Sequence, residues 1–183
     1  MGRLPELIAD GDLALRRWQV EDAEAQEAAV IASLDHLRPW MPWAAAEPQG
    51  LPTRRRMLER WEREWEVGGD ATYGIFLGGA LAGSCGLHRR RGPRTLEIGY
   101  WIAAGRTRRG LATRVAALLT ETAFAIDGIE RVEIHHDRAN LASAGVPRKL
   151  GFGFEGEARK APEAPGEEGV DCTWAIGRAE WRG

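Results

Sequence analysis

Residues 97–113 read Glu-Ile-Gly-Tyr-Trp-Ile-Ala-Ala-Gly-Arg-Thr-Arg-Arg-Gly-Leu-Ala-Thr and form the most informative stretch of the chain. The pattern predicts a strand that passes through a short basic turn into a helix. The first N–H groups of a helix have no intrahelical acceptor, and the helix dipole adds partial positive charge there. Arg106, Arg108 and Arg109 add full charges around the same point. The stretch therefore predicts a site for a small anion, and a pyrophosphate suits it best.

The overall composition is ordinary for a globular protein, with 183 residues, of which 44% are apolar and 28% charged. This length predicts one domain, residues 1–183, with a full hydrophobic core. The net charge of −2 argues against bulk attraction to nucleic acid or to an anionic membrane, so we expect neither as a partner. The basic residues are clustered in short stretches of the chain, so we expect an anion that they bind to be small.

The cysteines and the N-terminal stretch indicate a cytoplasmic protein. Cys85 and Cys172 lie far apart and neither belongs to a Cys-x-x-Cys pair, so a disulfide scaffold or a zinc site is not expected. Residues 1–10 lack the apolar core of a signal peptide. The chain also has no run of about 18 apolar residues that would span a membrane.

The hydrophobic pattern predicts strands and helices that alternate after a hairpin. The expected strands are residues 13–18, 72–77, 80–88, 95–102, 131–135, 170–177 and one that begins at 151–154. The expected helices are residues 21–34, 53–67, 110–126 and 140–150. In the helix at 110–126, apolar residues follow Leu111 at offsets of 4, 7, 8 and 15, which fits one helical face. We therefore expect an α/β (α+β) fold with a mixed, mostly antiparallel sheet flanked by helices.

Several short motifs occur in a fixed order along the chain. They are Glu97-Ile-Gly-Tyr-Trp, Thr107-Arg-Arg-Gly-Leu-Ala112, Asn140-x-x-Ser143, Lys149-Leu-Gly-Phe152 and the ending from Trp174 through Trp181. Together they resemble the GNAT superfamily of acetyl-CoA-dependent N-acetyltransferases, and within it the RimJ- and RimL-like branch that acetylates ribosomal-protein N-termini. The resemblance covers nearly the whole chain. One position departs from the pattern, because Thr107 stands where the family has Gln or Arg.

The resemblance implies that acetyl-CoA binds at the basic turn. The residues implied in its binding are Trp101, Ile102, Arg106, Thr107, Arg108, Arg109, Gly110, Leu111, Ala112, Thr113, Asn140 and Ser143. It also implies that the strand at 95–102 splays from its neighbour and that the pantetheine arm inserts between them. Free N–H groups near Trp101 and Ile102 would then polarise the thioester carbonyl. Because of Thr107, we expect the pyrophosphate contact to shift to Arg106 or Arg108.

Two residues are the candidate catalytic groups. Glu97 is the leading candidate for the base, since an amine must lose a proton before it attacks and a carboxylate can accept it. A salt bridge to a nearby arginine is the structural alternative for Glu97. Ser143 is the candidate proton donor to the departing thiolate, by analogy with the family. Asn140 has a structural alternative as the N-cap of its helix.

A histidine is the alternative base. The candidates are His88, His135 and His136, of which the last two point to opposite faces of one strand and so do not form a metal pair. The stretch from His36 to Trp43 lies where the family shapes the acceptor cleft, although its tryptophans also suit packing. Pro147 cannot donate to the carbonyl of Ser143, so that carbonyl is expected to face the cofactor or water.

The function expected from the resemblance is direct transfer of acetyl from acetyl-CoA to a primary amine, without a metal or a covalent enzyme intermediate. The branch favours the α-amino group of a protein N-terminus as the acceptor. A small amine such as a polyamine, an amino acid or an antibiotic is the alternative acceptor. A non-catalytic acyl-CoA-binding module is the alternative of another class. Related proteins are monomers or homodimers, and both states remain open.

Overall fold

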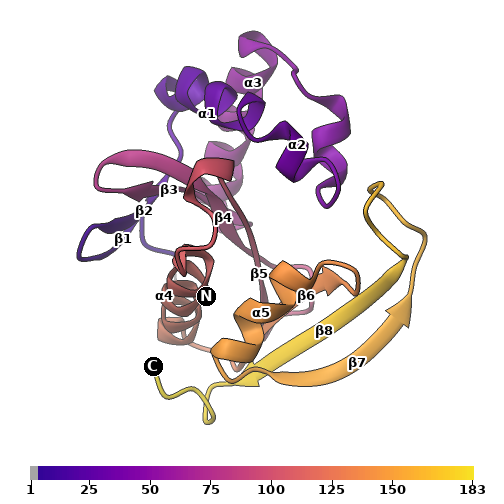
Figure 1. Cartoon of the computed structure of the whole chain (residues 1–183). Helices are drawn as coiled ribbons and strands as arrows, with labels where there is room; N and C mark the ends of the chain where they lie inside the picture. Colours follow the sequence, from indigo (N-terminus) through magenta and orange to yellow (C-terminus); the bar gives the residue numbers. More distant parts are fainter. Residues whose placement is uncertain (1–3) are drawn as a thin grey trace.

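The computed structural model describes residues 4–183, and residues 1–3 of the N-terminal stretch considered above lie outside it. Within residues 4–183 a single sheet has eight strands in the order β1-β2-β3-β4-β5-β6-β8-β7 (Figure 1). The strands are β1 Leu7–Asp10, β2 Leu13–Arg17, β3 Ala71–Leu77, β4 Ala80–His88, β5 Thr95–Ile102, β6 Arg131–Asp137, β7 Gly153–Arg159 and β8 Val170–Gly177. Only β5 and β6 pair in parallel. The predicted mixed, mostly antiparallel sheet is confirmed.

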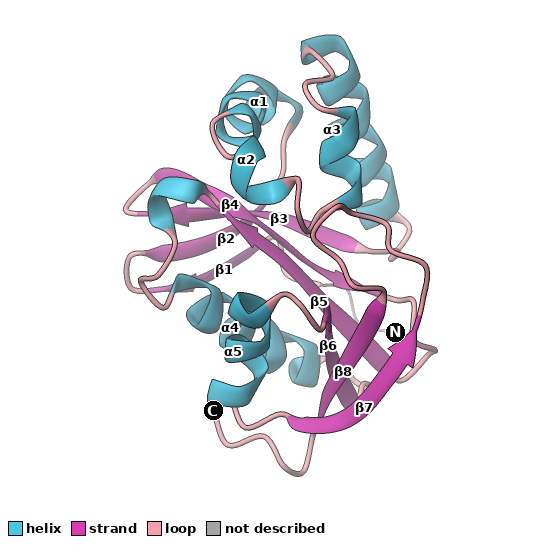
Figure 2. Ribbon diagram, turned by 45° about the vertical axis from the view of Figure 1, so that its right-hand side comes forward, coloured by secondary structure: helices cyan, strands magenta, loops and turns pink. Residues whose placement is uncertain are grey.

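Helices cover both faces of the sheet (Figure 2). On one face lie α1 Ala23–Ile31, α2 Leu34–Leu37 and α3 Leu51–Glu66, and on the other α4 Leu111–Ala125 and α5 Leu141–Lys149. Short 3-10 turns lie at Val20–Asp22, Pro42–Ala46 and Ala104–Arg106. The predicted apolar face of α4 is confirmed, because Leu111, Val115 and Leu119 are buried in the main core. No helix within residues 4–183 combines the length and the apolar character that crossing a membrane requires.

Residues 20–66, which we call the cap, have apolar clusters apart from the main core. One cluster contains Val30, Leu34, Leu37 and Ala44, and the other contains Ala23 and Leu58 together with Trp18, which lies just before the cap. A buried ion cluster ties the cap together, since the Arg54 guanidinium bonds the carboxylate of Glu27 at 3.0 Å and that of Glu47 at 2.7 Å. The cap is thus held largely by contacts of its own.

The structure differs from the sequence expectations in the N-terminal part. Strand β1 was not expected, and its short sequence offers little signal because most of it is exposed, with Leu7 at 57%. The helix expected at 21–34 is broken by Ser33, whose φ of −115° is not helical. The Ser33 hydroxyl accepts the N–H of Ala104 at 3.1 Å, so a contact distant in sequence fixes the break.

Strands β5 and β6 part halfway along their length. Their pairing ends at Ile98 and Ile134, although β5 runs on to Ile102 and β6 to Asp137. Beyond that point β5 stays paired with β4, and β6 stays paired with β8. The two strands therefore diverge and leave an opening in the middle of the sheet, which matches the expected splay.

Asp137 holds the end of β6 beside this opening. It is 5% exposed, and its carboxylate accepts the N–H groups of Ala139 at 2.9 Å, Glu168 at 3.0 Å, Gly169 at 2.9 Å and Val170 at 3.0 Å. Burial alone would raise the pKa of Asp137, but these four hydrogen bonds outweigh it and lower the pKa. One side chain thus joins β6 to the turn before α5 and to the loop that enters β8.

We predict that Asp137→Asn destabilises the protein by about 2–4 kcal/mol at neutral pH, because the new NH₂ group faces N–H donors and leaves them unpaired. The folded pKa of Asp137 is lowered, so its contribution is present above the unfolded pKa of about 3.9 and is lost as the pH falls through the folded value. Urea unfolding from pH 7 downward measures the difference between the two proteins.

The difference should narrow below about pH 4, and an unchanged difference there would contradict the prediction. Asp127→Asn is the matched control, since Asp127 is exposed in the turn after α4. It should shift stability by less than about 0.5 kcal/mol.

Candidate active site

A cleft of about 850 Å³ lies between the cap, the centre of the sheet and the loop that joins β7 to β8. Glu97 and Trp101 line it from one face of β5, and Tyr100 lines it from the other face. Asn140 and Ser143, at the start of α5, also line it. Because residues from both faces of β5 border one space, the cleft runs through the opening between β5 and β6.

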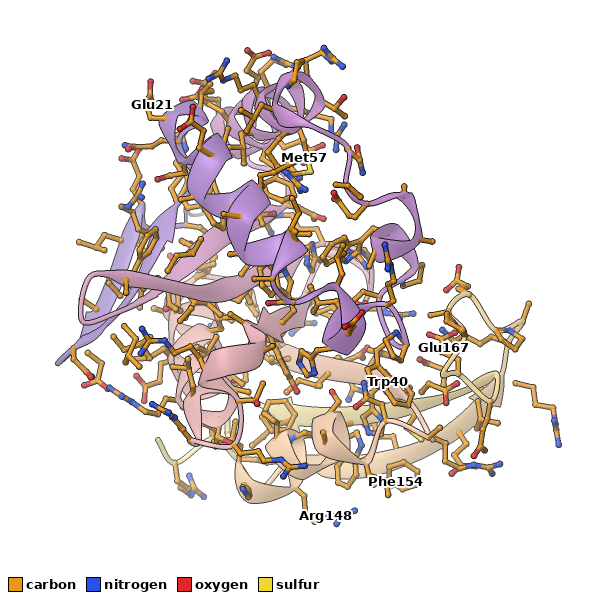
Figure 3. All side chains as sticks on the ribbon, turned by 45° about the horizontal axis from the view of Figure 1, so that its top comes forward. Glu21, Trp40, Met57, Arg148, Phe154 and Glu167 are labelled. Atoms are coloured by element: carbon orange, nitrogen blue, oxygen red, sulfur yellow. The ribbon has the colours of Figure 1, made fainter. Side chains whose placement is uncertain are left out.

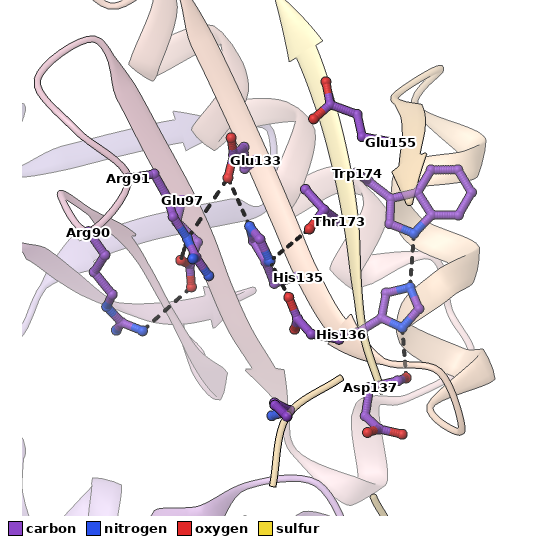
Figure 4. Close-up of polar contacts among 12 residues, drawn as sticks. Arg90, Arg91, Glu97, Glu133, His135, His136, Asp137, Glu155, Thr173 and Trp174 are labelled. Atoms are coloured by element: carbon purple, nitrogen blue, oxygen red, sulfur yellow. Dashed lines mark hydrogen bonds and ion pairs between the residues drawn. The ribbon is translucent and has the colours of Figure 1, made fainter. Parts of the chain in front are cut away.

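Glu97 lies on the cap side of the opening, inside a set of charged side chains (Figure 4). Its carboxylate accepts the Nε–H of Arg91 at 2.8 Å and lies 3.5 Å from Nη1 of Arg90. The strand-end salt bridge considered for Glu97 is therefore present. A carboxylate offers about four lone-pair sites, so Glu97 can accept further hydrogen bonds from water or an amine. Glu97 is thus both an ion-pair partner and a cleft residue.

His135 is held between two carboxylates (Figure 4). Its Nε2 lies 2.8 Å from Oε2 of Glu133, and its Nδ1 lies 2.9 Å from Oδ2 of Asp171. Burial opposes protonation of His135, but the hydrogen bonds to Asp171 and Glu133 outweigh it and raise the pKa. A histidine that favours its protonated form is a poor acceptor for the proton of an amine.

The other two histidines are also engaged. Nε2 of His136 accepts the indole N–H of Trp174 at 2.9 Å, and its Nδ1 lies 2.8 Å from the carbonyl oxygen of Asp137. This arrangement assigns the proton of a neutral His136 to Nδ1. His88 pairs through Nδ1 with Asp70 at 2.7 Å. These contacts favour Glu97 over His135 and His136 as the proton acceptor.

Ser143 meets a partner that the sequence analysis missed. The hydroxyl of Tyr100 lies 3.1 Å from Oγ of Ser143 and 3.5 Å from its carbonyl oxygen, the one that Pro147 cannot bond. Burial raises the pKa of Tyr100 to about 12, although the hydrogen bond with Ser143 opposes the shift. Tyr100 therefore keeps its proton at neutral pH. The alternation along β5, which places Tyr100 on the face opposite Glu97, is the sequence signal that could have identified Tyr100 as a site residue.

Asn140 serves as the N-cap of α5. Its side-chain oxygen accepts the N–H of Ser143 at 3.1 Å, so the structural alternative considered for Asn140 is present. The amide NH₂ is not used by this cap, and Asn140 also lines the cleft. Capping and ligand binding are thus compatible at this residue.

The start of α4 is open to an anion. Gly110 precedes the helix in the left-handed conformation, with φ 73°, and no side chain caps the helix. The N–H groups of Leu111, Ala112 and Thr113 have no intrahelical acceptor. The first turn has no acidic residue to compete with a ligand. Backbone donors and the positive end of the helix dipole are therefore free of a side-chain acceptor at this helix start.

The turn before α4 adds the basic side chains. Arg108 has φ 61°, and with Gly110 it curls the chain so that successive N–H groups converge. Arg108 and Arg109 are exposed and Arg106 is half-buried. The Thr107 hydroxyl donates to the carbonyl of Ala104 at 3.1 Å, so its proton is used within the turn. This favours the arginines for a phosphate contact.

The structure brings some of the predicted site residues together and separates others. Glu97, Trp101, Asn140 and Ser143 border the cleft, whereas residues 106–113 lie at the start of α4 and, within residues 4–183, form no part of its lining. The N–H of Ala103 donates to Ala82 on β4 at 2.8 Å.

Backbone groups alternate in direction along a strand, so the position of Ala103 orients its neighbours. Trp101, like Ala103, points its N–H toward β4, whereas Tyr100 and Ile102 point theirs toward the opening. The expected free N–H groups are therefore those of Tyr100 and Ile102. This corrects the expectation for the backbone of Trp101, whose side chain still lines the cleft.

The cap side of the cleft is aromatic. Trp40, Trp43 and Trp101, which we call the tryptophan wall, all line it. The rings of Trp43 and Trp101 have centroids 6.2 Å apart and are tilted by 52°. Two of the three side chains come from the segment between α2 and α3, and the third from β5.

The chain is similar to known acetyltransferases along most of its length. YdaF of Bacillus subtilis (strain 168), named as a candidate ribosomal N-acetyltransferase, is 27% identical over 172 residues, which cover 93% of this chain and 94% of YdaF. The structure of Mycobacterium smegmatis RimJ with CoA-disulfide is 26% identical, with a TM-score of 0.84, and covers 97% of this chain and 86% of RimJ.

A second similar structure is the Salmonella typhimurium acetyltransferase that modifies the N-terminal serine of ribosomal protein L7/L12. It is 20% identical, with a TM-score of 0.82, and covers 94% of this chain and 99% of that one. The family model described as the acetyltransferase (GNAT) domain matches residues 12–153. The chain therefore belongs to the GNAT family of acetyltransferases.

Proposed function

We propose that this protein transfers the acetyl group of acetyl-CoA to the α-amino group of a protein N-terminus. The observation that carries the proposal is the uncapped, basic start of α4 beside a sheet opening that leads to Ser143 and Glu97. The name of YdaF supports a ribosomal acceptor, and the action of the Salmonella enzyme on an N-terminal serine supports an N-terminal one. The free cysteines Cys85 and Cys172 agree with a reaction in the cytoplasm.

In this proposal the chain binds acetyl-CoA at two places. The N–H groups of residues 111–113 and the side chains of Arg106, Arg108 and Arg109 hold the pyrophosphate. The N–H groups of Tyr100 and Ile102, along the opening between β5 and β6, hold the pantetheine arm and polarise the thioester carbonyl. Asn140 adds its amide NH₂ from the start of α5.

The catalytic steps use side chains on both faces of β5. Glu97 accepts a proton from the acceptor ammonium, directly or through water, and the free amine attacks the thioester carbonyl carbon. The attacking nitrogen then loses its second proton to water as the C–S bond breaks, and Ser143 donates a proton to the departing thiolate. The Tyr100 hydroxyl holds Ser143 in place and can relay a proton from water to it, so that both hydroxyls are restored. A thiol pKa near that of cysteine, about 8.5, makes this last step helpful but not essential.

A small amine is the second candidate acceptor. One observation favours it, since the N–H of Gly166 in the β7–β8 loop donates to the carbonyl of Pro39 in the cap at 2.8 Å. This contact joins the two sides of the cleft and narrows the space for a long peptide. Thiol release from acetyl-CoA, measured with N-terminal peptides and with small amines, tests both candidates. Binding without turnover on every acceptor would instead indicate an acyl-CoA-binding module.

We predict that the double variant Arg108→Gln/Arg109→Gln binds acetyl-CoA at least about tenfold more weakly, because two charged contacts to the pyrophosphate are lost. Its affinity for acetylpantetheine, which has no pyrophosphate, should not change. Isothermal titration measures both affinities, with the exposed Arg159→Gln as the matched control. Equal losses for the two ligands would place the pyrophosphate elsewhere, and a wild type that fails to bind acetyl-CoA at high micromolar concentration would refute the cofactor assignment.

We predict that Glu97→Gln lowers kcat about 100-fold or more while leaving acetyl-CoA affinity unchanged, because the variant cannot accept the proton of the amine. His135→Gln should lower kcat by less than about fivefold, since His135 favours its protonated form. Steady-state kinetics with one acceptor compares the two variants. The reverse order of effects would identify His135 as the base.

We predict that Ser143→Ala slows acetyl transfer by about tenfold, less than the 10²–10³ that loss of an oxyanion donor costs. Tyr100→Phe should have a similar effect, and the double variant should be little slower than either single one, because the two hydroxyls share one hydrogen bond. The kcat values of the wild type, the two single variants and the double variant together form a double-mutant cycle. Independent, multiplying effects would show that Tyr100 does not act through Ser143.

A further inference from the structure

The tryptophan wall leaves aromatic surface open to water inside the cleft. Trp43 is 38% exposed, and Trp40 and Trp101 are half-buried. A ligand that covers a large aromatic side chain gains binding free energy, because it removes a large apolar face from water. Within residues 4–183, Trp101 is the one aromatic ring that pairs with Trp43. The wall is thus available to a bound molecule.

The wall and Glu97 lie on the same face of β5, with Gly99 between Glu97 and Trp101. At about 3.3 Å per residue, the two ends of this row lie roughly 13 Å apart. Position 99 has no side chain, and a Cβ there would come within 3.1 Å of Nε2 of His88. The His88 imidazole therefore covers Gly99, and an acceptor that passes over this ring has a carboxylate at one end of the row and an indole at the other.

The wall is bounded on its outer side by the β7–β8 loop. The N–H of Gly166 bonds the carbonyl of Pro39, the neighbour of Trp40, and a Cβ at Gly166 would lie only 2.6 Å from that carbonyl oxygen. Figure 3 shows Trp40 and Glu167 facing each other across this junction. The β7–β8 loop therefore bounds the aromatic surface on this side of the cleft.

We propose that the acceptor carries a large apolar or aromatic group next to its primary amine and that the tryptophan wall binds this group. The inference rests on the proposed function, because it needs a primary amine at the opening between β5 and β6. It separates this protein from the Salmonella enzyme, whose acceptor is an N-terminal serine. A serine side chain would leave the three indoles uncovered.

The test compares acceptors that differ only beside the amine. Four peptides share one sequence after a first residue that is phenylalanine, leucine, alanine or serine, and phenylethylamine stands for a small acceptor. We expect kcat/KM for the phenylalanine and leucine peptides to exceed that for the alanine and serine peptides by about tenfold to hundredfold. Transfer to phenylethylamine but to no peptide would support the wall with a small amine as its ligand.

Variants of the tryptophan wall provide the second part of the test. Trp43→Ala should lower kcat/KM for the phenylalanine peptide by about tenfold and change that for the alanine peptide by less than about twofold, while Trp43→Phe should retain most activity on both. Phe154→Ala is the matched control, because Phe154 is an exposed aromatic residue on β7 away from the cleft. It should leave both values unchanged.

The outcomes separate this inference from the proposed function. Equal kcat/KM for all four peptides would overturn the inference and leave N-terminal acetylation intact. A parallel loss on both peptides in Trp43→Ala, with weaker acetyl-CoA binding, would also overturn it, since Trp43 would then only support the fold. Absence of transfer to every amine, with acetyl-CoA bound, would overturn the proposed function itself.

Discussion

The parting of β5 and β6 beyond Ile98 and Ile134 is the constraint on which the site depends. A continuous ladder would consume the N–H groups of Tyr100 and Ile102 and would separate the two faces of the sheet. Because the strands diverge, one cleft reaches Glu97 on one face and Ser143 on the other. A broken pairing is costly in a sheet interior, and in the proposed function the unpaired groups hold the ligand.

The divergence is held open by contacts on both strands. On the β5 side, Ser33 of the cap accepts the N–H of Ala104 just after the strand. On the β6 side, the Asp137 carboxylate gathers four N–H groups from the turn and loop beyond it. Between the two strands lies the charged set around Glu133 and His135, in which arginine and histidine side chains form ion pairs with carboxylates. Local polar contacts thus replace the ladder that the opening removes.

Much of this arrangement follows from local sequence patterns. The face of α4, the hairpin of β3 and β4 and the alternation along β5 rest on periodicity and turn chemistry, which act over a few residues. The break at Ser33, the partner of Ser143 and the two arginines on Glu97 depend on residues that approach only in the fold. Strand β1 was not predicted for another reason, because its four largely exposed residues carry almost no hydrophobic pattern.

The separate apolar clusters of the cap have a consequence for how the acceptor specificity of such an enzyme evolves. Trp40 and Trp43 sit on a segment whose packing involves Leu34, Leu37 and Ala44 and not the main core. If the tryptophan wall selects the acceptor as proposed, substitutions at Trp40 and Trp43 change which amines are accepted and leave the start of α4, on the other face of the sheet, untouched. Acceptor choice can then change in evolution while the binding of the acetyl donor is retained.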